Sequence, residues 1–127
     1  MNTLPKSEIL SKRDEISALM KDGSSFAKRP VRVVYSHFST SEPEVKVFFS
    51  APKRNFKKAI DRNRIKRLMR EAYRLNKKVL LDTAHSSGKT FHIAFLFTGR
   101  EVPNFEEVQD KIILLLHRFR TEIHTDS

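Results

Sequence analysis

The sequence predicts an α+β protein in which a small mixed β-sheet packs with about three helices as a two-layer α/β sandwich. Three observations lead to this fold class. Apolar and polar residues alternate with a period of two in residues 31–35, 45–51 and 91–97. Between the second and third of these segments, apolar residues recur at the helical spacing of three and four. Residues typical of helix termini predict one further helix near each end of the chain.

Length and composition are those of one domain. The chain has 127 residues, and we expect a single domain over residues 1–127 with its core at about 10–119. It has no cysteine, which excludes a disulfide framework and a thiolate metal site. The sequence contains neither a run of about 18 apolar residues nor an apolar signal core at its N-terminus. We therefore expect a cytoplasmic protein with no membrane partner.

Local signals define the first helix and the first two strands. Ser11 is a candidate N-cap and Gly23 a candidate stop, which predicts a helix over Lys12–Lys21. The alternating segments 31–35 and 45–51 are separated by a turn-rich stretch. This arrangement predicts that the two strands pair as a β-hairpin.

The second half of the chain is predicted to form a helix, a strand and a helix. The central helix covers about Lys57–Leu81, and the Ser/Gly-rich stretch Thr83–Lys89 is predicted to be a loop. Residues 91–97 are largely apolar on both faces, which is typical of a central, buried strand. Asn104, with Glu107 three residues on, is expected to cap the last helix.

The central helix has one apolar side and one basic side. The apolar stripe holds Ile65, Leu68, Met69, Ala72 and Val79. The other side carries a row of cations four residues apart, Arg62, Lys66, Arg70 and Arg74. An ordinary solvated helix face mixes signs and gains from Glu–Lys pairs. This row repeats one sign, which favours a polyanion as its partner, and the arginine fork suits phosphate geometry.

The net charge is concentrated in this helix and its approach. Residues 53–78 contain twelve basic and two acidic residues, a net charge of +10. The whole chain also has a net charge of +10, so the remainder is neutral. Such a concentration is the electrostatic footprint of a nucleic-acid-binding protein.

The side chains do not form a catalytic or metal-binding motif. The five histidines show no H-x-x-x-H or H-x-E spacing, although His37 and His92 fall on predicted strands and could approach each other. The acidic residues are scattered, whereas a nuclease that holds Mg²⁺ needs convergent carboxylates. No Gly-rich phosphate loop is present. We therefore expect neither catalytic nor metal-binding residues in this chain, and the sequence favours a binding module.

One segment resembles a known family. The pair Lys53-Arg54 and the run Ala59-Ile60-Asp61-Arg62-Asn63-Arg64-Ile65-Lys66-Arg67 resemble the signature of the bacterial ribonuclease P protein subunit, an Arg-Asn-Arg helix preceded by a lysine pair. The resemblance covers about residues 10–119. It implies an α/β sandwich with a left-handed crossover, against the general right-handed rule.

The resemblance also implies an activity and partners. Ribonuclease P is an endonuclease that removes the 5′ leader of precursor tRNA, and its catalyst is an RNA that holds most of the required Mg²⁺. This chain is then expected to bind ribonuclease P RNA and precursor tRNA, and no obligate protein partner is evident.

The resemblance also implies roles for individual residues, at the positions that match the family's motif. The positions implied to face the RNA subunit are Lys53, Arg54, Arg62, Asn63, Arg64 and Arg67. The positions implied to line a cleft for the single-stranded leader are Ile16, Met20, Arg32, Val34, Lys66 and Arg70. Family members often have aromatic residues where this chain has Ile16, Met20 and Val34, which cannot stack on bases. Phe48 replaces a frequent glycine; either it packs under a helix or it restores a stacking surface to the cleft.

Two other function classes remain open from the sequence. A structural RNA-binding protein, such as a ribosomal protein of similar fold, would bind ribosomal RNA and leave tRNA processing unaffected. A DNA-binding factor is less favoured, because no helix-turn-helix pattern precedes the basic helix.

Overall fold

The computed structural model describes residues 4–125, which form one four-stranded sheet with helices on both faces. The strands are β1 Ser24–Lys28, β2 Val31–Ser39, β3 Val45–Ser50 and β4 Lys89–Phe97. Their order across the sheet is β1-β2-β4-β3. The β1–β2 and β2–β4 pairs are antiparallel and the β3–β4 pair is parallel, so the sheet is mixed as predicted.

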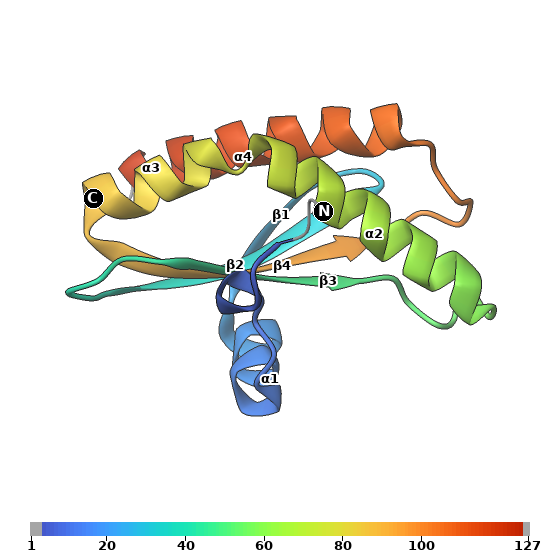
Figure 1. Ribbon diagram of the computed structural model, residues 1–127, viewed down its shortest axis with the longest axis horizontal. Coiled ribbons are helices and arrows are strands. Elements are labelled where there is room, and N and C mark those ends of the chain that lie inside the picture. The colour runs from blue at the N-terminus through green and yellow to red at the C-terminus, as the bar shows by residue number, and fades with distance from the viewer. Residues whose placement is uncertain (1–3, 126–127) are drawn as a thin grey trace.

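The helices form one complete layer and one partial layer. Their bounds are α1 Arg13–Asp22, α2 Ala59–Asn76, α3 Lys78–Ser87 and α4 Phe105–Thr125, preceded by the short 3₁₀ helix η1 Lys6–Glu8. In Figure 1, α2, α3 and α4 cover one face of the sheet and α1 stands on the opposite face. The three-helix layer and the sheet make the predicted two-layer sandwich.

The prediction of a central, buried strand at residues 91–97 is confirmed by β4. Its side chains from Thr90 to Phe95 are all buried, and both of its neighbours are strands. Phe91, Ile93 and Phe95 point into the layer of three helices, whereas Ala94 packs under α1. An apolar strand with two buried faces is most stable in the middle of a sheet.

The predicted hairpin between residues 31–35 and 45–51 is wrong. β4 lies between β2 and β3, and β2 instead forms a hairpin with β1, a strand that the sequence pattern did not reveal. Local alternation identified β2 and β3 as strands but carried no information on pairing. The doubly apolar β4 takes the central place between them, because only there are both of its faces covered.

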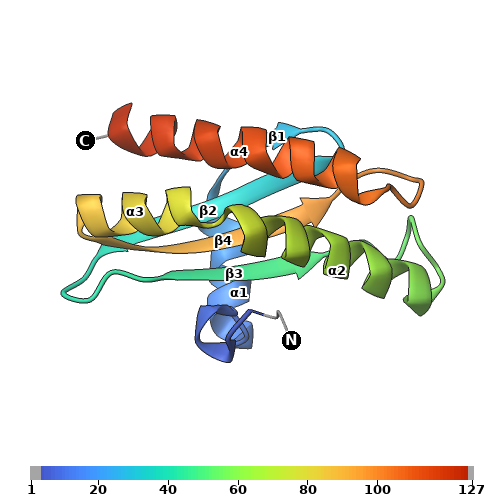
Figure 2. The ribbon, with the colours of Figure 1, turned by 45° about the horizontal axis from the view of Figure 1, so that its top comes forward.

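The connection from β3 through α2 and α3 to β4 is a left-handed crossover. In Figure 2 the helices lie toward the viewer, β3 and β4 both point to the right, and β4 lies above β3. A right-handed connection would place β4 below β3 in this view. The structure therefore has the handedness that the family resemblance implied.

The helical region is longer and more divided than predicted. The central helix breaks at Lys77, and the predicted loop Thr83–Lys89 is wrong, because α3 continues to Ser87. The hydroxyl of Ser87 donates to the carbonyl of Thr83 at 2.7 Å, so the serine side chain bonds back to the preceding turn of the helix. Gly88, at φ 68°, then ends the helix in the left-handed conformation that favours glycine.

The two predicted helix starts have different outcomes. The backbone N–H of Glu107 donates to Oδ1 of Asn104 at 2.9 Å, which confirms the cap of α4. Ser11 is not the cap of α1, because Lys12 occupies that position without a side-chain bond. Gly23 does end α1, and its lack of a side chain matters for packing: a Cβ there would lie 2.7 Å from Cγ1 of Val34.

Candidate nucleic-acid interface

Aromatic packing fixes α2 on the sheet. Ile65, Met69 and Tyr73 are fully buried on the inner side of the helix. The Tyr73 ring lies 5.6 Å from the ring of Phe95 and 6.1 Å from the ring of Phe49. Burial raises the pKa of the Tyr73 hydroxyl, so this residue stays neutral and belongs to the core. The outer sides of α2 are therefore presented in a fixed orientation.

One outer side of α2 faces the solvent. Asn63, Arg64 and Arg67 are all solvent-exposed. Neither arginine forms an ion pair with any carboxylate in residues 4–125. Unpaired arginine forks on a rigid helix suit bidentate contacts with phosphate oxygens.

A second side of α2, formed by Arg62, Lys66 and Arg70, is half-buried, and we call it the sheet-facing side because Arg70 contacts Phe49 of β3. The Arg62 guanidinium donates to the carbonyl of Phe56 at 2.7 Å and to the carbonyl of Lys57 at 3.0 Å. The Arg70 guanidinium carbon lies 5.8 Å from the ring centroid of Phe49. Arg62 therefore holds the approach loop in place, besides contributing positive charge.

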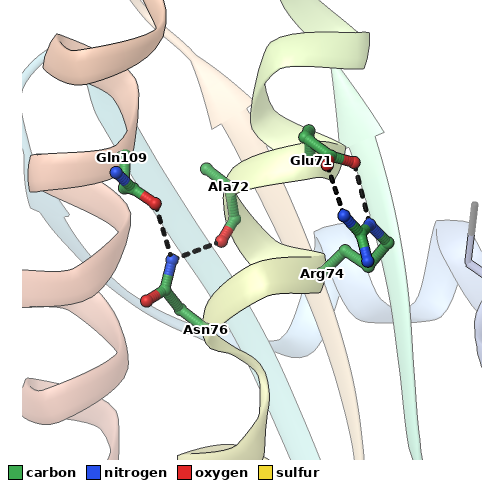
Figure 3. Close-up of polar contacts among 5 residues, drawn as sticks. All are labelled: Glu71, Ala72, Arg74, Asn76 and Gln109. Carbon is green, nitrogen blue, oxygen red and sulfur yellow. Dashed lines mark hydrogen bonds and ion pairs between the residues drawn. The ribbon is translucent and has the colours of Figure 1, made fainter. Parts of the chain in front are cut away.

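Arg74 belongs to the basic row by its spacing, but a neighbouring acidic residue compensates its charge. Figure 3 shows its guanidinium against the carboxylate of Glu71, with Nε donating to Oε2 at 2.9 Å. Hydrogen bonds from Arg74 lower the pKa of Glu71, so the pair stays charged at neutral pH. On the other side of the helix end, the Asn76 amide donates to Gln109 of α4 at 3.2 Å. Among the described residues, the members of the row without an ion pair are thus Arg62, Lys66 and Arg70.

The loop before α2 is basic and anchored. Lys53 and Arg54 are exposed, whereas Phe56 is buried and packs 5.9 Å from the ring of Phe97. The Asn55 amide donates to the carbonyl of Gly99 at 3.3 Å, which ties the loop to the end of β4. The basic pair before the helix therefore sits on an ordered loop.

The residues predicted on α1, β2 and β3 meet on the other face of the sheet. Ile16 and Phe48 are partly buried and pack against one cluster, formed by Leu10, Leu19, Val34 and Ala94. Val34 itself is 6% exposed, which gives it a packing role beneath α1 and leaves little surface for a ligand. Met20 and Arg32 remain exposed beside this cluster.

The structure divides the predicted leader-cleft residues into two groups on different faces of the sheet. Lys66 and Arg70 lie on α2, above the sheet in Figure 1, whereas Ile16 and Met20 lie on α1, below it. β3 is the edge strand between them, and Ile9 pairs with Val47 along part of its outer edge. A single strand of RNA that touches both groups has to pass around the end of β3.

The structure also gathers arginines that the sequence pattern did not single out. Arg29 and Arg100 line one depression together with Arg32. Arg29 and Arg100 are far apart in the chain, and only the pairing of β2 with β4 brings them together. No local motif signals this grouping.

The histidines and acidic residues do not converge. His37 packs against Phe91 on one face of the sheet, while His92 contacts Phe38 on the other. Within residues 4–125, no three histidine or acidic side chains gather closely enough to hold a metal ion. None of the helices described is long and apolar enough to cross a membrane.

Comparisons with known proteins agree with this geometry. Residues 4–120 match the Ribonuclease P family. The ribonuclease P protein component of Porphyromonas gingivalis (strain ATCC 33277) is 41% identical over 107 residues, which are 84% of this chain and 78% of that protein. The ribonuclease P protein component of Chlorobium phaeobacteroides is 37% identical over 131 aligned positions, which cover 94% of this chain and 90% of that protein.

Solved structures show the same fold. The RNase P protein from Thermotoga maritima has a TM-score of 0.68 at 25% identity and covers 87% of this chain and 96% of that one. The RNase P protein of Staphylococcus aureus has a TM-score of 0.62 at 20% identity, covers 88% of this chain and 94% of that one, and supports the fold alone. Since the family matches across residues 4–120, this chain belongs to the ribonuclease P protein family.

Proposed function

We propose that this protein binds two RNAs, the catalytic RNA of ribonuclease P and the 5′ leader of precursor tRNA, and thereby supports endonucleolytic removal of the leader in the cytoplasm. Membership of the ribonuclease P protein family supports the role of a ribonuclease P subunit. The observation that carries the two-RNA proposal is the division of α2 into two basic sides, one exposed and one turned toward the sheet.

The exposed side is proposed to bind the RNA subunit. Asn63, Arg64 and Arg67 stand out from the protein on a helix whose inner side is locked in the core. Lys53 and Arg54 extend the same charge along the approach loop. A folded RNA presents closely spaced phosphates, and arginines on a helix that is already fixed in place can contact them without ordering of the backbone.

The sheet-facing side is proposed to bind the leader. Lys66 and Arg70 provide charge, and Ile16, Met20, Arg32 and Phe48 lie on the far side of the sheet around the end of β3. A single-stranded leader is flexible enough to follow such a path. Because Ile16 and Met20 lack rings, we expect this protein to hold the leader mainly through its phosphates.

Catalysis is assigned to the RNA subunit. Mg²⁺ prefers carboxylate and phosphate oxygens in octahedral sets. The residues described here do not fit such a set, because Glu8, Glu44, Glu71 and Glu122 pair with lysine or arginine and the other acids do not converge. We propose that the Mg²⁺ ions of the reaction are held mainly by the RNA, and that this chain positions the substrate.

The Arg67→Ala variant tests the exposed side. We expect weaker binding to ribonuclease P RNA, and a log–log salt dependence that is flatter by about 0.7–0.9, the value for one phosphate that is no longer neutralised. The matched control is Arg74→Ala, on the same helix, because Arg74 is already paired with Glu71. Titration of each variant with RNA at several salt concentrations measures both quantities.

An unchanged slope for Arg67→Ala would mean that this arginine is solvated in the complex. Binding to ribosomal RNA, with no effect on precursor tRNA cleavage, would instead favour a structural RNA-binding role.

A further inference from the structure

A basic depression lies at the end of the sheet where β1 turns into β2 and where β4 ends. Its volume is about 430 Å³. None of its lining residues is acidic or aromatic, and three are arginines: Ala27, Arg29, Pro30, Arg32, Thr98, Gly99 and Arg100. Its chemistry therefore suits an anion and provides no ring on which a base could stack.

The backbone that carries these arginines is fixed. The N–H of Thr98 donates to the carbonyl of Pro30 at 2.7 Å, which joins the β1–β2 turn to the end of β4. A Cβ on Gly99 would lie 3.0 Å from Cβ of Pro30, so the two segments touch there because glycine has no side chain. Arg29 and Arg100 are thereby held at neighbouring positions, and little backbone ordering is needed on binding.

The three arginines lack acidic partners. Within residues 4–125, no ion pair involves Arg29, Arg32 or Arg100, and Arg32 donates one hydrogen bond to the neutral hydroxyl of Ser25. By contrast, Arg74 and Arg118 are each paired with a glutamate on their own helix. Three like charges around one depression repel one another, and a bound phosphate relieves that repulsion.

The depression opens on the face of the sheet that carries α1. Arg32 is opposite Ala27 on β1 and opposite Leu96 on β4, and Leu96 packs against the cluster under α1. The exposed arginines of α2 belong to the helix layer on the other face. β2 lies two strand spacings from β3, about 10 Å. The depression is therefore placed to meet a strand that has already passed the end of β3.

We propose that Arg29, Arg32 and Arg100 bind a backbone phosphate of the precursor tRNA leader, upstream of the nucleotides held beside α2. This inference rests on the proposed function. Such a contact recognises the charge of the RNA backbone and not the base sequence. Affinity then depends on whether the leader is long enough to reach the depression. The Asn55–Gly99 hydrogen bond ties this site to the loop before α2, and both ends of the leader path then belong to one rigid body.

A charge-matched pair of double variants tests the site in reconstituted holoenzyme. Arg29→Gln/Arg100→Gln removes two charges from the depression. Lys78→Gln/Arg120→Gln removes two exposed charges elsewhere, one from α3 and one from α4. Binding is measured for precursor tRNAs whose leaders are shortened one nucleotide at a time, for mature tRNA, and for ribonuclease P RNA alone, with a thermal melt of each variant.

We expect wild-type affinity to fall in a step once the leader becomes too short to reach the depression, and Arg29→Gln/Arg100→Gln to lack that step. With long leaders, loss of the one single-strand phosphate contact flattens the log–log salt dependence by about 0.7. That slope corresponds to a difference of roughly 2.6-fold over a fourfold change in salt. Mature tRNA, assembly with the RNA, and the control variant should be unaffected.

Two outcomes would overturn the site. A step that persists in Arg29→Gln/Arg100→Gln would show that these arginines are solvated, and an equal loss in binding to ribonuclease P RNA alone would assign the depression to the RNA subunit. Failure of the proposed function would look different, because the wild-type holoenzyme itself would then not distinguish precursor from mature tRNA.

Discussion

Precursor tRNA is expected to stay intact when it is mixed with this protein alone, and to be cleaved once a bacterial ribonuclease P RNA is added at low Mg²⁺. The described residues offer no group of three or more histidine or acidic side chains that could hold a metal ion, and His37 and His92 lie on opposite faces of the sheet. A binding surface without such groups can position a substrate but provides no means of activating water. We therefore expect almost no cleavage without the RNA and efficient cleavage with it.

The measurement is a gel assay of 5′ leader release with protein alone, RNA alone and both together. Low Mg²⁺ matters, because the positive charge of the protein then supplies part of the neutralisation that the ions otherwise provide. Robust cleavage by protein that has been treated extensively with ribonuclease would contradict the assignment of catalysis to the RNA.

The Phe48→Ala variant is expected to lose stability. Phe48 packs against the cluster under α1, so truncation removes buried apolar surface and leaves a cavity. A fully buried Phe→Ala change costs about 3–5 kcal/mol, and because Phe48 is only partly buried we expect about 2–4 kcal/mol. That is a large share of the roughly 5–15 kcal/mol that stabilises a typical domain. Urea unfolding of the two proteins measures the difference.

Phe38→Ala is the matched control for that experiment. Phe38 lies on the same face of the sheet and is 46% exposed, with its ring edge against His92. Its truncation should cost about 1 kcal/mol or less. If Phe48→Ala instead melted like wild type but lost leader affinity, Phe48 would act as a stacking surface in the leader path.

Local patterns in the sequence were sufficient for the elements but not for their pairing. β4 was recognised as central because both of its faces are apolar, and α2 because its apolar and basic sides follow the helical period. The β2–β3 hairpin was wrong, because strand alternation is the same whichever neighbour a strand has. Composition predicts a loop at Ser87, whereas its hydroxyl bonds back to the Thr83 carbonyl, an interaction that depends on the chain already being helical.

The candidate site was predictable where its residues share one helix. The helical period places Asn63 and Arg67 beside the row of Arg62, Lys66 and Arg70, whereas the family resemblance groups Arg62 with the RNA-subunit positions. The sequence pattern counts Arg74 among the cations of the row, and the structure removes it by pairing it with Glu71 at i, i+3. Arg29 and Arg100 could not be found in this way, because the register of β2 on β4 brings them together.

The central claim is that α2 binds two RNAs with two different sides, and the most direct test is the Arg70→Ala variant in reconstituted holoenzyme. Affinity is measured for precursor tRNA and for mature tRNA, with Arg67→Ala measured in parallel and a thermal melt of each variant, since Arg70 also contacts Phe49. We expect Arg70→Ala to weaken precursor binding, to flatten its log–log salt dependence by about 0.7, and to leave mature tRNA binding and assembly unchanged. Arg67→Ala should weaken assembly instead. Equal losses for both tRNAs on Arg70→Ala, or a loss of assembly like that of Arg67→Ala, would contradict the claim and place Arg70 on the surface that binds the RNA subunit.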